Sequence, residues 1–208
     1  MKLQVSFDMT NLNNALQIAS SIAKYTDIIE VGTLLIYRYG IAAVEQFKKM
    51  FPNKSILADT KIVDRGQEVV PLFAQAGADW ITVMAGTSKN VIHRTCTAAH
   101  KLNVNVMLDL LDSSTVGQAA LEAKNLGVDA LLFHSPYDEQ ESLIFLDKWD
   151  MIKGNTTIPI FVSARIDRDN VDEVIKVKPD GLVIGKSITE AENPQKEAQF
   201  FYEITTSN

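Results

Sequence analysis

The sequence predicts a (β/α)8 barrel in which residues 1–208 form a single domain. Eight short apolar runs recur at regular spacing, and stretches with helical periodicity separate them. Strands that alternate with helical patterns indicate βαβ units and a parallel sheet. A doubly wound sheet is the alternative, but that fold usually has fewer strands and a glycine-rich first turn. The first turn here would be residues 8–11, which contain no glycine.

The apolar runs define the predicted strands at residues 3–7, 28–31, 55–58, 80–84, 105–110, 130–133, 160–162 and 181–184. Between them, helical periodicity is clear at residues 12–23, 41–50 and 116–125. Gly77 and Gly127 stand where a helix should end before the next strand, and residues 178–180 take that place before the last strand. Proline is tolerated near a first helical turn, so we expect the helix that contains Pro71 to begin near Val69.

The composition is that of a globular protein, with 46% hydrophobic and 22% charged residues. A net charge of −6 argues against a nucleic-acid-binding surface, although a local site can still bind a small anion. The single cysteine, Cys96, excludes an internal disulfide and suits a reducing compartment. Without a signal-peptide pattern or a long apolar run, we expect a cytoplasmic protein that does not bind membranes.

The most informative segment is residues 58–64, Ala-Asp-Thr-Lys-Ile-Val-Asp, which closes the third predicted strand. Asp59 and Lys61 are two residues apart, so on a regular strand their side chains point to the same face. Inside a barrel both charges would leave water, which is costly unless they pair with each other or bind something. A purely structural salt bridge at the strand end is the alternative.

In (β/α)8 barrels the active site forms at the C-terminal ends of the strands. Polar residues stand at or just after nearly every predicted strand end. They are Asp8, Glu30, Thr33, Asp59, Lys61, Asp109, His134, Arg165, Gly185 and Lys186. A buried ionisable cluster without a role would be costly, so the set as a whole indicates a functional site.

The residue types indicate roles. Glu30 and Asp59, on neighbouring strands, suit Mg²⁺, which prefers one or two carboxylates plus water and substrate oxygens. Lys61 could stabilise negative charge that develops on a substrate oxygen, and His134 could transfer a proton near neutral pH. Residues 185–186, which lead into the final helical region, could bind a phosphate through backbone N–H groups, the helix dipole and one cation.

A second group of possible metal ligands lies on one predicted helix. His93, Cys96 and His100 are spaced i, i+3 and i+7, so they share one helical face. A zinc site normally needs three or four ligands, and no fourth ligand is near. We interpret this group as a partly buried helix face.

Taken together, these segments resemble the orotidine-phosphate-decarboxylase-like group along essentially the whole chain. Within it, the chain is similar to the family of hexulose-6-phosphate synthase and 3-keto-L-gulonate-6-phosphate decarboxylase (KGPDC). The D-x-K-x-x-D element of residues 59–64 is the most specific match. The other matching segments are Asp8, residues 27–33 (Asp-Ile-Ile-Glu-Val-Gly-Thr), residues 77–83, His134 and residues 184–189.

The resemblance implies a homodimeric barrel that binds a phosphorylated sugar and Mg²⁺, with the metal held by Glu30 and Asp59. It implies that Asp8 and Lys61 contact substrate oxygens, and that the partner's Asp64 enters the site. The chemistry implied is a 1,2-enediolate of a pentulose phosphate. The synthase forms it by deprotonating ribulose 5-phosphate and adds it to formaldehyde, whereas the decarboxylase forms it by losing CO₂ and then protonates it.

Two positions favour the synthase. The decarboxylases typically have Glu where this chain has Asp109, and Arg where it has Tyr137. The family usually has a Gly-Gly pair after strand seven, whose amides hold the phosphate, but this chain has Ala164-Arg165. The Arg165 guanidinium could replace those amides as a bidentate donor. Alternatively the ligand differs, and the barrel is a binding module without this catalysis.

Overall fold

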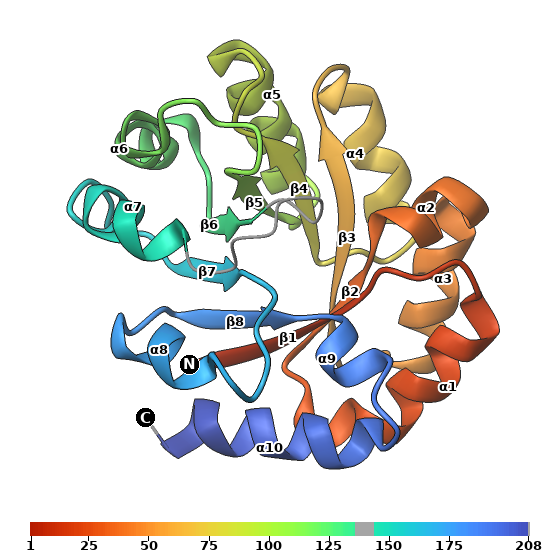
Figure 1. Cartoon of the computed structure of the whole chain (residues 1–208). Coiled ribbons are helices and arrows are strands. Elements are labelled where there is room, and N and C mark those ends of the chain that lie inside the picture. Colours follow the sequence, from red (N-terminus) through yellow and green to blue (C-terminus); the bar gives the residue numbers. More distant parts are fainter. Residues whose placement is uncertain (136–143, 208) are drawn as a thin grey trace.

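The computed structural model describes residues 1–135 and 144–207, and it confirms the predicted barrel. Eight parallel strands pair in sequence order, and β8 pairs with β1 to close the sheet (Figure 1). The strands are β1 Lys2–Phe7, β2 Ile28–Val31, β3 Ser55–Ile62, β4 Trp80–Met84, β5 Asn105–Asp109, β6 Ala130–His134, β7 Ile160–Ser163 and β8 Gly181–Ile184.

Helices surround the barrel on its outer side (Figure 1). No helix within residues 1–135 or 144–207 is both long and apolar enough to span a membrane. The helices are α1 Leu12–Ile22, the 3-10 turn η1 Ala23–Tyr25, α2 Thr33–Tyr39, α3 Ile41–Met50, α4 Gly66–Gln75, α5 Lys89–His100, α6 Val116–Leu126, α7 Ile144–Lys153, α8 Val171–Lys176, α9 Lys186–Thr189 and α10 Pro194–Ser207.

The predicted start of α4 is wrong by three residues, because the helix begins at Gly66 rather than Val69. The carbonyl of Arg65 accepts the amides of both Glu68 and Val69 and so starts the helix early. Pro71 therefore lies inside the helix, where it removes one helical hydrogen bond. Val70 and Phe73 bury their side chains against the core on either side of Pro71. This burial holds the helix together despite the missing bond.

The core has two layers, as the alternation of side chains along each strand requires. One layer joins the outward faces of the strands to the helices. The other fills the lower part of the barrel interior and consists of Ile28, Leu57, Met107, Ala130, Leu132, Phe161 and Val183, with Trp80 against it. This inner layer closes the barrel below its C-terminal mouth, so the polar residues above it face one opening.

Four aspartates fasten the opposite, N-terminal end of the barrel. Each precedes an even-numbered strand and accepts the backbone N–H of a residue in the preceding odd-numbered strand, at 2.8–2.9 Å. The pairs are Asp27 with Leu3, Asp79 with Ile56, Asp129 with Val106, and Asp180 with Ile160. These carboxylates link neighbouring strands and are separate from the carboxylates at the C-terminal mouth.

Candidate functional site

The strand-end residues predicted from the sequence converge at the C-terminal mouth, because all eight strands run in parallel. Asp59 and Lys61 end β3, Asp109 ends β5 and His134 ends β6. The Lys61 ammonium lies 2.9 Å from Asp59 Oδ2 and 3.0 Å from Asp109 Oδ2. His134 Nδ1 lies 3.0 Å from the same Asp109 oxygen. Four ionisable groups from three strands thus form one continuous network.

The network is buried at its base and open at its top. The Asp109 side chain is fully buried, whereas those of Lys61 and His134 keep 22% and 24% of their surface exposed. Asp109 also accepts the backbone N–H of Leu111, at 2.9 Å. The carboxylate is therefore held by the backbone that follows β5, and the Lys61 ammonium and the His134 imidazole remain accessible to a molecule in the mouth.

Pairing outweighs burial in setting the pKa values of this network. Burial alone would raise the pKa of Asp109, but the hydrogen bond and charge of His134, with the charge of Lys61, hold it below its ordinary value. Burial would likewise lower the pKa of His134, but the bond to Asp109 raises it overall. Asp59 and Asp109 similarly raise the pKa of Lys61 against the effect of burial. Lys61 is therefore a permanent cation at neutral pH.

Glu30 lies on β2 beside this network and is almost completely buried. Its two carboxylate oxygens accept hydrogen bonds from Gln4 Nε2 and Ser6 Oγ on the adjacent strand β1. Burial, and then the charge of Asp59, raise the pKa of Glu30 to about 7. Two carboxylates that repel each other in a buried setting form an oxygen donor set that a hard divalent cation would stabilise.

The carboxylate oxygens of Glu30 and Asp59 are therefore suitable ligands for Mg²⁺. The Lys61 ammonium also lies beside Asp59, at 2.9 Å. Among residues 1–135 and 144–207, no three or more His, Cys, Asp or Glu side chains are grouped to hold a metal ion by themselves. A cation here would need water or ligand oxygens as well, as Mg²⁺ usually does. On α5, His100 contacts Asp129 at 2.9 Å and Cys96 is buried, which agrees with the structural interpretation of that helix face.

Asp8, Thr33 and Asp64 stand at the rim or in the wall of the mouth. Asp8 is exposed after β1, and its carboxylate accepts the backbone N–H of Leu34, so it caps the start of α2. Thr33 donates its hydroxyl to Asp59 Oδ2 at 2.7 Å and so helps to orient that carboxylate. Asp64 is exposed beyond β3 and accepts the backbone N–H of Arg65.

Arg165 and Gly185 lie in the loops that follow β7 and β8. Arg165 is exposed and adopts a left-handed backbone (φ 47°), the conformation that a glycine would favour. Its carbonyl accepts a hydrogen bond from the Asn170 side chain. The sequence placed residues 185–186 before the final helix, but α9 is a single turn of four residues, and α10 is separate. A helix dipole would therefore add little here.

Comparisons with known proteins agree with this architecture. The orotidine 5'-phosphate decarboxylase / HUMPS family matches residues 1–201. The chain belongs to this family. It is 31% identical to the 3-hexulose-6-phosphate synthase of Bacillus subtilis (strain 168) over 200 residues, which is 95% of both chains.

Two solved structures of this family are also close in shape. The 3-hexulose-6-phosphate synthase of Salmonella typhimurium superposes with a TM-score of 0.94 and 30% identity, over 100% of this chain and 99% of that one. A ligand-bound structure of KGPDC from Streptococcus mutans superposes with a TM-score of 0.89 and 25% identity, over 99% and 97%. The resemblance seen in the sequence is confirmed at the level of the family and of its synthase and KGPDC members.

Three residues in this member of the family were missed by the sequence analysis. Gln4 and Ser6 hold Glu30, and the buried Thr82 on β4 contacts both Asp59 and Lys61. All three side chains point into the barrel. Because alternate residues of a strand share a face, the polar residues at the inward positions of β1 and β4 were the signal that could have identified them. Tyr137, which the sequence analysis used to favour the synthase, lies outside the described residues.

Proposed function

We propose that the protein is a Mg²⁺-dependent hexulose-6-phosphate synthase that joins ribulose 5-phosphate to formaldehyde. One observation carries the proposal, namely the Lys61 ammonium held between Asp59 and Asp109 with His134 on the same Asp109 oxygen. This arrangement supports a role for Lys61 as a permanent cation and for His134 as a proton-transfer group at the open mouth. The names of relatives at about 30% identity support the choice of reaction.

In this mechanism His134, in its neutral form, takes a proton from the carbon next to the keto group of ribulose 5-phosphate. The electron pair moves to the keto oxygen and gives a 1,2-enediolate, whose charge Lys61 stabilises. The carbanionic carbon then attacks formaldehyde, and the protonated His134 gives its proton to the new alkoxide, which regenerates the neutral imidazole. Mg²⁺, held by Glu30 and Asp59, would supply further positive charge near the two oxygens. Asp8 and Thr33 would contact substrate hydroxyls.

Decarboxylation of 3-keto-L-gulonate 6-phosphate is the alternative, because it passes through the same enediolate and KGPDC from S. mutans is a structural neighbour. The test is to incubate the purified protein and Mg²⁺ with ribulose 5-phosphate and formaldehyde, and in parallel with the keto-gulonate phosphate. Formation of a hexulose phosphate supports the synthase, and release of CO₂ supports the decarboxylase. Turnover of neither compound would favour a barrel that only binds a phosphorylated ligand.

Metal dependence should follow from Glu30 and Asp59. We expect EDTA to abolish activity, added Mg²⁺ to restore it, and Mg²⁺ to raise the melting temperature of the metal-free protein. Glu30→Gln removes one donor charge and should remove most of the Mg²⁺-induced shift in melting temperature. Full activity in EDTA, or an equal shift in the Gln variant, would contradict this assignment.

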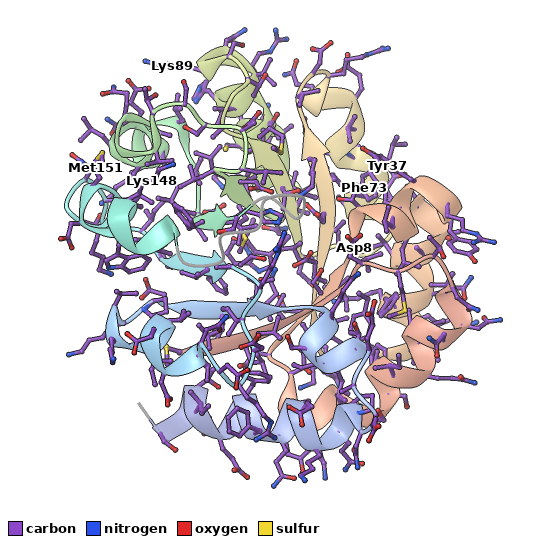
Figure 2. All side chains as sticks on the ribbon, in the orientation of Figure 1. Asp8, Tyr37, Phe73, Lys89, Lys148 and Met151 are labelled. Carbon is purple, nitrogen blue, oxygen red and sulfur yellow. The ribbon has the colours of Figure 1, made fainter. Side chains whose placement is uncertain are left out.

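A homodimer with shared sites is also part of the proposal, and the surface beside Asp64 supports it. Apolar side chains stand exposed on α2, on α4 and just after β3, namely Leu34, Tyr37, Val63 and Leu72. Tyr37 on α2, labelled in Figure 2, is 80% exposed. An exposed apolar surface of this kind is typical of a protein–protein interface, and a two-fold dimer through it would bring Asp64 toward the neighbouring mouth.

Hybrid dimers test this arrangement. Asp64→Ala and Lys61→Ala proteins should each be nearly inactive, but mixing them should restore part of the activity, because one hybrid site keeps both residues. Subunit exchange is checked by native mass spectrometry of differently tagged chains. If exchange is complete and no activity returns, the sites are not shared.

Arg165 should bind the substrate phosphate, with the backbone at Gly185 and the ammonium of Lys186 as further donors. Arg165 itself is exposed, but a charge-assisted bond that becomes buried when the phosphate binds costs about 2–5 kcal/mol when one partner is removed. Arg165→Ala should therefore raise KM for the phosphorylated sugar strongly, whereas Arg168→Ala, which breaks a surface pair with Glu197, should not. Unchanged kinetics in the Arg165 variant would show that Arg165 has only a surface role.

A further inference from the structure

The third strand is irregular at the point where its functional residues stand. β3 pairs with β4 through Leu57 and Trp80, then Ala58 and Ile81, but the next pair is Ile62 with Val83. Residues 59–61 of β3 thus lie opposite the single residue Thr82. An insertion of this kind is a bulge, which redirects side chains and recurs next to functional sites.

Lys61 has the unusual backbone in this bulge. Its φ is 45°, in the left-handed region that residues with side chains seldom adopt. Such a conformation persists only where its surroundings hold it. Asp59 and Lys61 therefore do not share a face simply through the period of a regular strand, as the sequence analysis assumed. Other contacts must therefore stabilise the bulge so that the Lys61 ammonium lies between Asp59 and Asp109.

Thr82 makes the contacts that hold it. Its hydroxyl oxygen accepts the backbone N–H of Lys61 at 2.8 Å, and the same hydroxyl donates to Asp59 Oδ1 at 2.8 Å. Its carbonyl accepts the hydroxyl of Thr60, also at 2.8 Å. Thr82 is only 1% exposed, so water cannot replace these bonds. One side chain therefore fixes both the strained backbone of Lys61 and the orientation of Asp59.

We propose that Thr82 is a positioning residue that holds the Lys61 ammonium and the Asp59 carboxylate in their working geometry. The proposal rests on the proposed function, in which Lys61 stabilises the enediolate and Asp59 holds the cation. A hydroxyl is needed because the position requires both an acceptor and a donor, and valine, of nearly the same shape, offers neither. Serine keeps both.

The experiment compares Thr82→Val, Thr82→Ser and a control, Thr95→Val. Thr95 on α5 is also fully buried, and its hydroxyl donates to the Val91 carbonyl within the same helix. We expect Thr82→Val to lower kcat about 10- to 100-fold with little change in KM, as for other residues that orient ligating groups. Thr82→Ser should regain most of kcat, and Thr95→Val should lower the melting temperature without changing kcat. Thr82→Ala serves in the same way if the valine variant does not fold.

Crystal structures of the native protein and the Thr82→Val variant give a second readout that needs no activity. The variant should show Lys61 outside the left-handed region and its ammonium away from Asp109. If the native protein turns over neither sugar phosphate, the proposed function fails, while these structures still decide the role of Thr82. A native kcat in Thr82→Val, an equal loss in Thr95→Val, or an unchanged Lys61 geometry would each overturn the proposal.

Discussion

Replacing Lys61 with methionine should lower kcat/KM for ribulose 5-phosphate and formaldehyde by about 10³-fold, the upper range for loss of one group that stabilises a developing oxyanion. Methionine keeps the length and apolar stem of the side chain but has no charge. It leaves Asp59 and Asp109 facing each other without the cation that now lies 2.9–3.0 Å from both. The loss should fall mainly on kcat, because the charge on the substrate oxygen develops in the transition state.

The matched control for this variant is Lys48→Met. Lys48 makes an ion pair with Asp79 at 2.8 Å, with comparable exposure of the lysine, but near the N-terminal end of the barrel. Lys61→Met loses two ion pairs and Lys48→Met loses one, and steady-state kinetics with melting curves separate the effect on catalysis from the effect on stability. We expect Lys48→Met to keep its kcat. A Lys61→Met protein that is folded and retains more than about a tenth of the native kcat/KM would contradict the role given to Lys61.

The fold was predictable because short apolar runs alternate along the sequence with stretches of helical periodicity. The strands are short apolar runs that are largely buried on both faces, and several of the stretches between them show a period near 3.6, so the alternation indicates a barrel. The site was largely predictable for the same reason, since parallel strands bring all their C-terminal ends to one mouth. Glu30, Asp59, Asp109 and His134 could be placed together without any knowledge of the strand order.

Features that depend on the register between strands could not be predicted. The bulge in β3 exists only in relation to β4, so neither the left-handed backbone of Lys61 nor the contacts of Thr82 can be read from residues 58–64. The contact of Gln4 with Glu30 likewise depends on the pairing of β1 with β2, so the sequence of β1 alone does not reveal it. Arg165 has a left-handed backbone, which residues with a side chain seldom adopt. Sequence rules therefore disfavour this conformation, and it persists only where the surrounding structure holds it.

Residue type alone does not separate an aspartate of the candidate site from one that links strands at the other end of the barrel. Asp129 and Asp109 each contact a histidine and a backbone amide, with closely similar distances. Asp129 comes just before its strand and links β5 to β6 at the N-terminal end, whereas Asp109 comes at the end of its strand and lies in the mouth. Position relative to the strand therefore separates the two roles, and this information is present in the sequence.

Asp109→Asn should lower kcat by about 10²-fold, the lower range for losing general acid–base catalysis. The variant should also move the pH dependence of kcat/KM. In the native protein the bond and charge of Asp109 raise the pKa of His134 above its ordinary value of 6.5. Since the proposed base is the neutral imidazole, activity should rise with pH through this raised pKa. The amide removes the negative charge, so burial and Lys61 then lower the pKa, and the rise should move to lower pH.

Asp129→Asn provides the comparison for this pH shift, because it breaks the similar contact with His100 at the other end of the barrel. Its pH profile should match that of the native protein, even if its melting temperature falls. The same direction of shift should appear in the pKa of His134 measured by NMR, since the imidazole proton is observed there directly. If kcat/KM of Asp109→Asn keeps the native acid limb while the NMR pKa of His134 falls, another group removes the proton. In that case Asp109 serves mainly to hold Lys61, and the base must be sought elsewhere around the mouth.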